Sequence, residues 1–448
     1  MSKSSDEAGD SVFDFAMLQG VWRSRGYGNL LEIGPEGYTV YEETRVSCLP
    51  VFAGSLDELA EHYVDVRVSP RRQTFDTQRA AGVARVGFRR LKALPHGCTT
   101  LGEGRRSDPE FNFEVFWQTF AEHYALFDLK AVDWQSVYST YRLQVSSKTK
   151  QARLFEIFVE MLRPLADGHV QLHTTCGHFT GGATIPLYDR LAAELDKADD
   201  TRDVASYLAD LREALRDRIR EDYLQVGFQR TASGHLEWGR LNGDTGYLAI
   251  RAMAGLSGRV GRPRLDLQAA DKAMKQVIEQ LGQLRTMVVD LRGNAGGYDA
   301  VALRLAGYLT DRKRLAFSKS ARYGTSYTGK QNIYVQPSQA DRYKGRLIVL
   351  TSGLTASAAE VFVLALLQHP QLTLIGEPTH GILSDAMERH LPNRWFLTLS
   401  NEIYHAFDGE LYEDCGIPPH IEIPFLAQDG RESGCDPMLD YILDSACI

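Results

Sequence analysis

The chain has 448 residues, of which 44% are hydrophobic and 24% are charged, and its formal net charge is −8. This length predicts two or three domains, and the composition is that of a folded globular protein. The acidic balance argues against a nucleic-acid binder, because phosphate recognition needs a basic field. The best candidate for a membrane span, Val361 to Leu367, is far shorter than the roughly 20 residues needed and instead predicts a buried helix.

The first segment, residues 1–11, is polar and acidic and lacks the basic and apolar regions of a secretory signal. We therefore expect a disordered tail and a cytoplasmic protein, with secretion open only if a leader has been removed. Six cysteines are scattered without a CxxC spacing, and in a cytosolic chain we expect them to be mostly reduced and buried. A Cys48–Cys98 bridge within the first domain remains an alternative.

Residues 12–104 are predicted to form an all-β domain, either a small barrel or a sandwich. Short alternating stretches such as Tyr38–Tyr41 and Val64–Val68 are separated by glycine, proline and asparagine. The stretch from Ser55 to His62 predicts one short helix. A polar linker is expected from Gly102 to Pro109, and no catalytic constellation is visible in this part of the chain.

Residues 105–168 are predicted to form a small helical bundle. Aromatic and apolar residues recur at helical spacing from Phe111 to Tyr124, which is typical of core packing. A second helix is expected to begin after Asp133 as its N-cap, and a third to run from Lys150 to Leu162 and end at Pro164.

Residues 169–448 are predicted to form an α/β domain with a covered sheet. Buried strands are expected at Gly246–Ile250, Thr286–Leu291, Arg346–Thr351 and Leu372–Gly376, with helices at Leu267–Leu284, Ala300–Leu309 and Ala356–Leu367. A densely charged stretch near residues 187–221 predicts a solvated helix pair, an insertion or lid without chemistry of its own.

Ser357 is the first candidate for chemistry. It follows a buried strand and a turn, at the start of a helix whose free N–H groups and positive end stabilise an alkoxide or oxyanion. The structural alternative is that Ser357 or Thr355 serves only as an N-cap.

The glycine-rich turn Asp290–Gly297 is the second candidate. Glycines after a buried strand expose N–H donors, so this turn could supply half of an oxyanion hole, although a purely structural turn is an equal alternative. It is not a phosphate loop, because the GK[ST] ending is missing.

A serine nucleophile needs a base and a group that orients the base. His169, in Asp167-Gly168-His169-Val170, is the candidate base, and Glu413 or Asp414 is the candidate carboxylate, with a solvated turn as the alternative for the latter. His169 also belongs to a loose cluster with His173, Cys176 and His178, whose spacing matches no standard zinc scheme, so no metal or other cofactor is expected.

These signals occur in an order that resembles the tail-specific (C-terminal processing) protease and tricorn-core family. The matching pieces extend from about residue 111 to 424 and are Phe116-Trp117-Gln118-Thr119-Phe120, Leu165-Ala166-Asp167-Gly168-His169, Asp290-Leu291-Arg292-Gly293-Asn294-Ala295-Gly296-Gly297, Thr355-Ala356-Ser357-Ala358-Ala359-Glu360, Gly376-Glu377-Pro378-Thr379 and Gly416-Ile417-Pro418-Pro419. The resemblance implies a ClpP/crotonase-like sandwich in the catalytic domain, a peptide or protein substrate, and a tendency toward homo-oligomers.

The resemblance also implies roles for residues. Ser357 would be the nucleophile, and the N–H groups of Ala358 and of Gly297 or Gly296 would form the oxyanion hole. The tail-specific branch uses a lysine where this chain has Ile382, so the tricorn-like arrangement with a histidine and a carboxylate, here His169 and Glu413, fits better. The chain departs from that branch at Gly168, where a serine is usual, and Asp167 could then help to orient the histidine. No PDZ-like insertion is visible.

The sequence therefore predicts a serine peptidase with a Ser357–His169–Glu413 constellation. Two alternatives remain open. One is a ligand-binding relative that has lost hydrolysis, and the other is a hydrolase or cyclase specialised for one small substrate.

Overall fold

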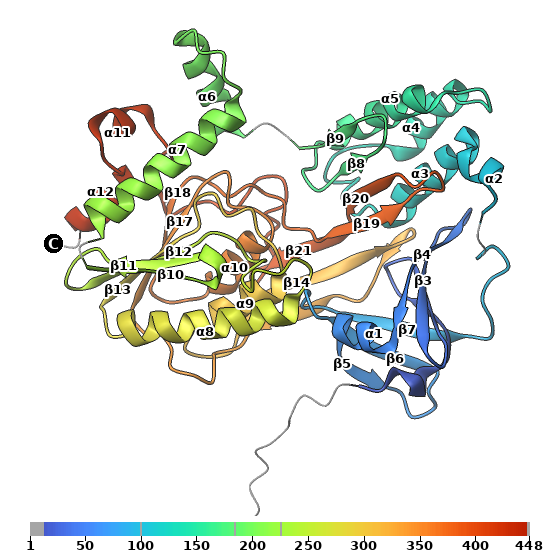
Figure 1. The fold of residues 1–448 in the computed structure, drawn as a ribbon, viewed down its shortest axis with the longest axis horizontal. Coiled ribbons are helices and arrows are strands. Elements are labelled where there is room, and N and C mark those ends of the chain that lie inside the picture. The colour runs from blue at the N-terminus through green and yellow to red at the C-terminus, as the bar shows by residue number, and fades with distance from the viewer. Residues whose placement is uncertain (1–12, 99–100, 183–184, 225, 446–448) are drawn as a thin grey trace, which may run out of the picture. The chain divides into compact units, whose positions relative to one another are not determined.

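The computed structural model describes residues 13–98, 101–182, 185–224 and 226–445, so the expected disordered tail at residues 1–11 lies outside the described residues. The chain divides into two compact units (Figure 1). Unit 1 comprises Met1–Gly181, Ser320–Gly329 and Ala386–Glu402, and unit 2 comprises Gly182–Lys319, Lys330–Asp385 and Ile403–Ile448. The structure defines the geometry within each unit.

Unit 1 begins with one seven-stranded antiparallel sheet, which confirms the all-β prediction but as a single sheet and not a two-sheet sandwich. Its strand order is β4-β3-β2-β1-β7-β6-β5. The strands are β1 (Gly20–Ser24), β2 (Asn29–Ile33), β3 (Gly37–Glu43), β4 (Cys48–Ser55), β5 (Tyr63–Val68), β6 (Thr74–Arg79) and β7 (Arg85–Leu91), after a short 3-10 turn η1 (Phe15–Leu18).

The predicted short helix of this region is α1 (Leu56–His62), which connects the edge strands β4 and β5. Ser55 caps it by accepting the N–H of Glu58 at 3.3 Å. Cys48 and Cys98 form a disulfide, so the alternative that the sequence left open is the one the structure contains. Of the other described cysteines, which are free thiols, Cys176 and Cys415 are exposed and Cys435 is half-buried, so the expectation that the reduced cysteines are buried was wrong.

The predicted bundle contains the helices α3 (Pro109–His123), α4 (Trp134–Tyr141) and α5 (Gln151–Leu162), with the 3-10 turns η2 (Arg142–Gln144) and η3 (Arg163–Leu165). Asp133 caps α4 as expected, accepting two backbone N–H groups. The aromatic stripe packs inside, with the rings of Phe116 and Phe158 stacked at 3.9 Å between centroids. The expected linker instead contains a short helix, α2 (Glu103–Ser107).

A second sheet in unit 1 was not predicted. It has the order β19-β20-β8-β9 and consists of β8 (Gln171–His173), β9 (His178–Thr180), β19 (Ala386–His390) and β20 (Phe396–Ser400). Trp395, which precedes β20, packs edge-on against Phe158 of α5. This sheet positions His169, because β8 begins two residues after it.

Unit 2 is built on a seven-stranded sheet of order β10-β11-β12-β13-β17-β18-β22, which is parallel from β12 onward. Its strands are β10 (Val226–Thr231), β11 (Leu236–Arg240), β12 (Thr245–Ile250), β13 (Thr286–Asp290), β17 (Arg346–Thr351), β18 (Leu372–Gly376) and β22 (Ile421–Glu422). The predicted buried strands are confirmed, and the α/β class with them.

Both faces of this sheet are covered by helices, and α7 and α8 lie on opposite sides of it in Figure 1. One side carries α8 (Pro263–Leu281), α9 (Asp299–Gly307) and α10 (Ala358–Leu366), and the other carries α6 (Pro186–Lys197), α7 (Val204–Arg218) and α12 (Pro437–Ser445). Leu191 and Leu208 are buried in one core with Ile348 of β17. The charged helix pair is thus not merely solvated, because its apolar stripe covers the sheet.

The remaining elements are a π-turn η4 (Ile219–Tyr223), a 3-10 turn η5 (Ala232–Gly234), the strands β14 (Arg314–Tyr323), β15 (Ser326–Tyr327), β16 (Gln331–Val335) and β21 (Glu402–Ala406), and α11 (Gln428–Ser433). β14 pairs with β15, β16 and β21. Across the described part of the chain, no helix has the length and apolar character needed to cross a bilayer.

Candidate active site

Ser357 occupies a sharp turn between a buried strand and a buried helix. β17 ends at Thr351 and α10 begins at Ala358, and every residue of α10 is buried. Ser357 has φ 55° and ψ −124°, a conformation that non-glycine residues rarely adopt. Ser357 is the N-cap residue of α10, and Glu360 accepts its N–H as in a capping box, but an ordinary N-cap has extended φ and ψ, so capping alone does not account for this geometry. Such strain persists only where the surrounding structure enforces it, and it is concentrated at functional sites.

The turn before Ser357 is held from both sides. The hydroxyl of Thr355 donates to the carbonyl of Leu291 at 3.0 Å and accepts the N–H of Ser352 at 3.0 Å. The carboxylate of Glu360, one turn into α10, accepts the N–H of Ser357 at 2.9 Å. Thr355 therefore has a structural role, whereas Ser357 is presented at the positive end of the helix.

The glycine turn lies against Ser357 because β13 and β17 are parallel neighbours, so the loops at their carboxyl ends meet. Gly296 has φ 95°, and a Cβ atom there would lie 2.8 Å from both Ala358 N and Ser357 Cβ. Gly297 has φ 144°, and a Cβ atom there would lie 2.4 Å from the carbonyl carbon of Met253. Close approach of the backbone therefore requires glycine at both positions.

Asn294 locks this arrangement with three hydrogen bonds. Its Nδ2 donates to the carbonyl of Ile250 at 2.8 Å, its Oδ1 accepts the N–H of Gly296 at 2.8 Å, and its carbonyl accepts the N–H of Ala356 at 3.0 Å. Within the described residues, the N–H groups of Gly297 and Ala358 donate to no protein acceptor. These two donors, unlike that of Gly296, are available to a ligand oxygen.

A buried ion network fixes the start of the glycine turn. Arg292 pairs with Asp290 at 2.9 Å and with Asp436, at the start of α12, at 2.8 Å, and all three residues are buried. Burial alone would raise the pKa of Asp290, but the charge and hydrogen bonds of Arg292 outweigh it and lower that pKa to about 2. Asp290 is therefore ionised throughout the neutral range.

A second turn, residues 377–384 after β18, packs beside the serine turn. Glu360 Oε1 accepts the Thr379 hydroxyl at 2.6 Å and the N–H of Gly381 at 2.8 Å, and Oε2 accepts the N–H of Ile382 at 3.0 Å. Burial raises the pKa of Glu360 to about 7, although these hydrogen bonds act in the opposite direction. The sequence contained Glu360 only as part of a motif, and its contacts with a turn some twenty residues away were not foreseen.

Glu413 continues the same pattern. It is buried, and its Oε2 accepts the N–H groups of Leu383 at 3.2 Å and Ser384 at 3.0 Å. Asp414, its exposed neighbour, donates its N–H to the carbonyl of Gly381. The four consecutive N–H groups from Gly381 to Ser384 are thus all held by two carboxylates, and of the two acidic candidates Glu413 is the buried one.

His169 belongs to unit 1, in the turn between η3 and β8. Its N–H donates to Asp167 Oδ1 at 2.8 Å, and its carbonyl accepts the hydroxyl of Thr398 on β20 at 2.5 Å. Asp167 accepts a main-chain N–H of the turn, so it shapes the backbone that presents His169.

A second histidine lies in unit 2, close to the serine turn. His380 Nδ1 is 3.0 Å from the carbonyl oxygen of Gly353, and its backbone N–H donates to the carbonyl of Thr355. Because a carbonyl only accepts, Nδ1 carries the proton and Nε2 is the basic nitrogen in the neutral ring. His380 is therefore the rival to His169 that experiments must exclude.

The loose histidine cluster contains one close pair. His173 and His178 are cross-strand partners on β8 and β9, with their Nδ1 atoms 3.1 Å apart. In the described ranges of the chain, no three histidine, cysteine or acidic side chains converge as a metal ion would require.

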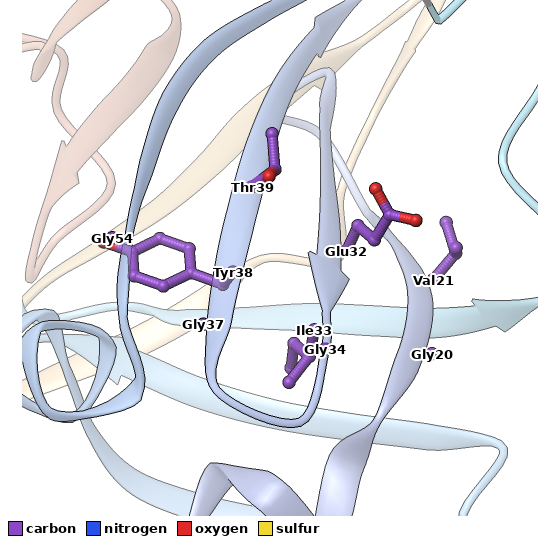
Figure 2. A pocket seen from close by; sticks show the side chains of 9 residues that line it. All are labelled: Gly20, Val21, Glu32, Ile33, Gly34, Gly37, Tyr38, Thr39 and Gly54. Carbon is purple, nitrogen blue, oxygen red and sulfur yellow. The ribbon is translucent and has the colours of Figure 1, made fainter.

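A shallow hollow of about 400 Å³ lies on the N-terminal sheet (Figure 2). It is lined by residues of β1 to β4 and the turns between them, four of them glycines. Its one acidic group, Glu32, accepts the Tyr41 hydroxyl at 2.8 Å. The hollow holds no base or nucleophile pair that would make it a second catalytic site.

Unit 2 thus brings together four of the predicted site residues, Ser357, Ala358, Gly296 and Gly297, and sets Glu413 against the adjacent turn. Comparison with known proteins shows which families two parts of the chain resemble. Residues 244–423 match the model of peptidase family S41, and residues 105–163 match the tricorn protease C1 domain. The stretch from residue 244 to 423, less than half of the chain, is thus similar to peptidase family S41. All four of these residues, with Glu360 and Glu413, fall inside it.

The chain has relatives of several kinds. A carboxy-terminal-processing protease of Bartonella bacilliformis is 30% identical over 190 residues, which cover 41% of this chain and 40% of that protein. The aligned part is therefore less than half of that curated relative. A crystallised candidate peptidase from Parabacteroides merdae shares the fold, with a TM-score of 0.60, 23% identity, and coverage of 75% of this chain and 96% of its own. Mature CPAF is similar too, with a TM-score of 0.55, 13% identity and coverage of 76% and 97%.

Proposed function

We propose that this protein is a serine peptidase that cleaves peptide bonds through an acyl-enzyme on Ser357. The observation that carries the proposal is the strained conformation of Ser357 at the N-terminus of buried α10, beside two N–H groups that have no acceptor among the described residues. The match of residues 244–423 to the model of peptidase family S41 supports the same chemistry.

In the proposed first step, Ser357 Oγ attacks the carbonyl carbon of the scissile bond while His169 takes the hydroxyl proton. The N–H groups of Ala358 and Gly297 bind the oxygen that becomes negative, and each such donor is worth about 3 kcal/mol in comparable enzymes. The carbon–nitrogen bond then breaks, and His169 delivers its proton to the leaving amine. Water, activated by the same histidine, hydrolyses the ester and restores Ser357.

Glu413 is proposed to orient the imidazole of His169 and to stabilise its cation. One of its oxygens, Oε2, already accepts two backbone N–H groups, which fixes the side chain in place. A carboxylate whose position is fixed can select one tautomer of a histidine, which is the role of the acid in serine triads.

The proposal also includes the branch of the family, the fold of the catalytic domain, and the location and assembly of the protein. Ile382 stands where the tail-specific branch has lysine, which favours the tricorn-like histidine mechanism. The ClpP/crotonase-like arrangement of the catalytic domain is proposed from the family resemblance. A peptide or protein substrate, a cytoplasmic location, assembly into homo-oligomers and the domain boundaries at residues 104, 168 and 187–221 remain predictions.

Replacing Ser357 by alanine tests the proposal. Hydrolysis of a mixed peptide library, followed by mass spectrometry, should fall by at least about 10³-fold in Ser357→Ala, because removing a triad nucleophile leaves only residual catalysis. Thermal unfolding of the variant should stay close to that of the wild type. A parallel screen of esters and lactones separates a peptidase from a hydrolase for one small substrate. Peptide cleavage that persists at full rate in Ser357→Ala would overturn the assignment.

A further inference from the structure

One buried carboxylate joins the serine turn to the turn beside it. The Glu360 side chain is fully buried and faces four donors from two separate loops. Oε2 takes the N–H groups of Ser357 and Ile382, and Oε1 takes the Thr379 hydroxyl and the N–H of Gly381. No other described group bridges the N–H of Ser357 to residues 379–382.

Only the ionised form of Glu360 can satisfy all four donors. A carboxylate accepts at both oxygens, whereas a protonated carboxyl must itself donate one hydrogen bond. Thr379 could accept that proton, but its own hydroxyl hydrogen would then lose its partner, since Thr379 Oγ1 already accepts the N–H of Ile417 at 2.7 Å. Protonation therefore leaves at least one buried donor unpaired, unless one of the two turns moves.

The groups around Glu360 do not include a compensating cation. Within the described residues, no arginine or lysine forms an ion pair with it. The titratable residues beside it are Glu413, Asp414, Cys415 and His380, whose Nδ1 donates to the carbonyl of Gly353 and not to Glu360. Burial raises the pKa of Cys415, and the charges of Asp414, Glu360 and Glu413 raise it further. Hydrogen bonds and the N-terminus of α10 are thus what hold the charge of Glu360 in place.

We propose that Glu360 is a positioning residue whose negative charge holds the Ser357 turn against residues 379–382, and that loss of this charge releases the two turns and lowers the reactivity of Ser357. We call the hydrogen bonds of Glu360 to Ser357 and to residues 379–382 the clamp. The predicted effect on reactivity rests on the proposed function, whereas the clamp itself does not. The proposal predicts that two groups inactivate the site when they bind a proton as the pH falls: the catalytic histidine and Glu360.

A rise in pH should change folding stability and the reactivity of Ser357 in opposite directions. Burial raises the pKa of Glu360 from 4.5 to about 7 in the folded protein. Its contribution to folding stability is therefore fully present below the unfolded value and is lost as the pH rises through about 7. Reactivity of Ser357, by contrast, should increase over the same interval, because the carboxylate becomes ionised there.

The test uses Thr379, which supports the charged form of Glu360 without touching Ser357. Thr379→Val removes one hydrogen bond to the carboxylate, so the pKa of Glu360 should rise by about one unit. Thr379→Ser keeps the hydroxyl and is the matched control. The clamp is followed by hydrogen exchange and mass spectrometry of a peptide spanning residues 379–384, corrected for the intrinsic pH dependence of exchange. The reactivity of Ser357 is measured separately, as its rate of labelling by a fluorophosphonate.

We expect the peptide to lose protection as the pH falls through about 7 in the wild type, with the midpoint higher by about one unit in Thr379→Val and restored in Thr379→Ser. The pH at which the labelling rate of Ser357 falls to half should shift by the same amount in each variant. Protection without a midpoint near neutral pH, or a midpoint that Thr379→Val does not move, overturns the proposal. The proposal is also overturned if protection changes with pH while the labelling rate stays the same. If Ser357 never labels, the proposed function fails, and the exchange experiment still decides whether the clamp exists.

Discussion

At the scale of single residues, Gly296 is the position where the serine turn and the glycine turn press most closely together. A Cβ atom added there would lie 2.7 Å from Ala356 O and 2.8 Å from both Ala358 N and Ser357 Cβ, and its φ of 95° is one that only glycine adopts readily. Any side chain there must displace the backbone that presents the nucleophile or the N–H of Ala358.

We predict that Gly296→Ala lowers kcat, or the labelling rate of Ser357, by roughly 10²-fold, which is the scale of losing one oxyanion donor. Gly293→Ala is the matched control, because Gly293 also has a positive φ, of 85°, but its added Cβ would meet the side chain of Arg212 at 2.9 Å. A flexible side chain can move aside. Both variants should lose stability by about 1 kcal/mol or more from the strained φ, and only the first should lose reactivity. Equal kinetic losses in the two variants would contradict this account of Gly296.

At the scale of secondary-structure elements, the network of Asp290, Arg292 and Asp436 ties the end of β13 to the start of α12. Arg292 is enclosed, with its side chain 2% exposed in the ion pair with Asp290, so its charge depends on both carboxylates. Because the same loop leads to Gly296 and Gly297, the network supports the site through the backbone and makes no contact with Ser357 itself.

Asp436→Ala should destabilise the protein by about 3–5 kcal/mol in denaturant unfolding, because it leaves a buried arginine only partly compensated. Glu213→Ala is the control, since it removes an exposed pair with Arg216 and should cost less than about 1 kcal/mol. The folded pKa of Asp290 is lowered, so its contribution is present above the unfolded value of 3.8 and is lost as the pH falls toward about 2. A loss for Asp436→Ala no greater than for Glu213→Ala would show that the network is not what holds these elements together.

The elements differ in how well the sequence predicts them. β13, β17 and α10 were predicted because each is a continuous apolar run, and such a run is stable only when both of its faces are buried. β8 and β9 were missed because each has only three residues, and because β20, which holds β8 on its other side, comes from far along the chain. The charged α6–α7 pair was misjudged because its apolar stripe is narrow and only the sheet reveals what it covers.

At the scale of the whole molecule, the predicted order of an all-β region, a helical segment and an α/β domain is found, and the candidate site is found in part. Ser357, Ala358 and the glycine turn could be placed from sequence, because a strand, a turn and a helix define them locally. The bonds of Glu360 and Glu413 to residues 379–384 could not, since they depend on three separate segments meeting. The Cys48–Cys98 disulfide is more typical of oxidising compartments than of the cytoplasm, and location stays a prediction.

The proposal that His169 activates Ser357 can be tested with a single labelling experiment. The protein is treated with a fluorophosphonate probe, and labelled sites are mapped by mass spectrometry in the wild type, His169→Ala and His380→Ala, each first shown to unfold cooperatively. The account predicts labelling at Ser357 that is lost in His169→Ala and retained in His380→Ala. Labelling that survives in His169→Ala, or that disappears only in His380→Ala, would contradict it.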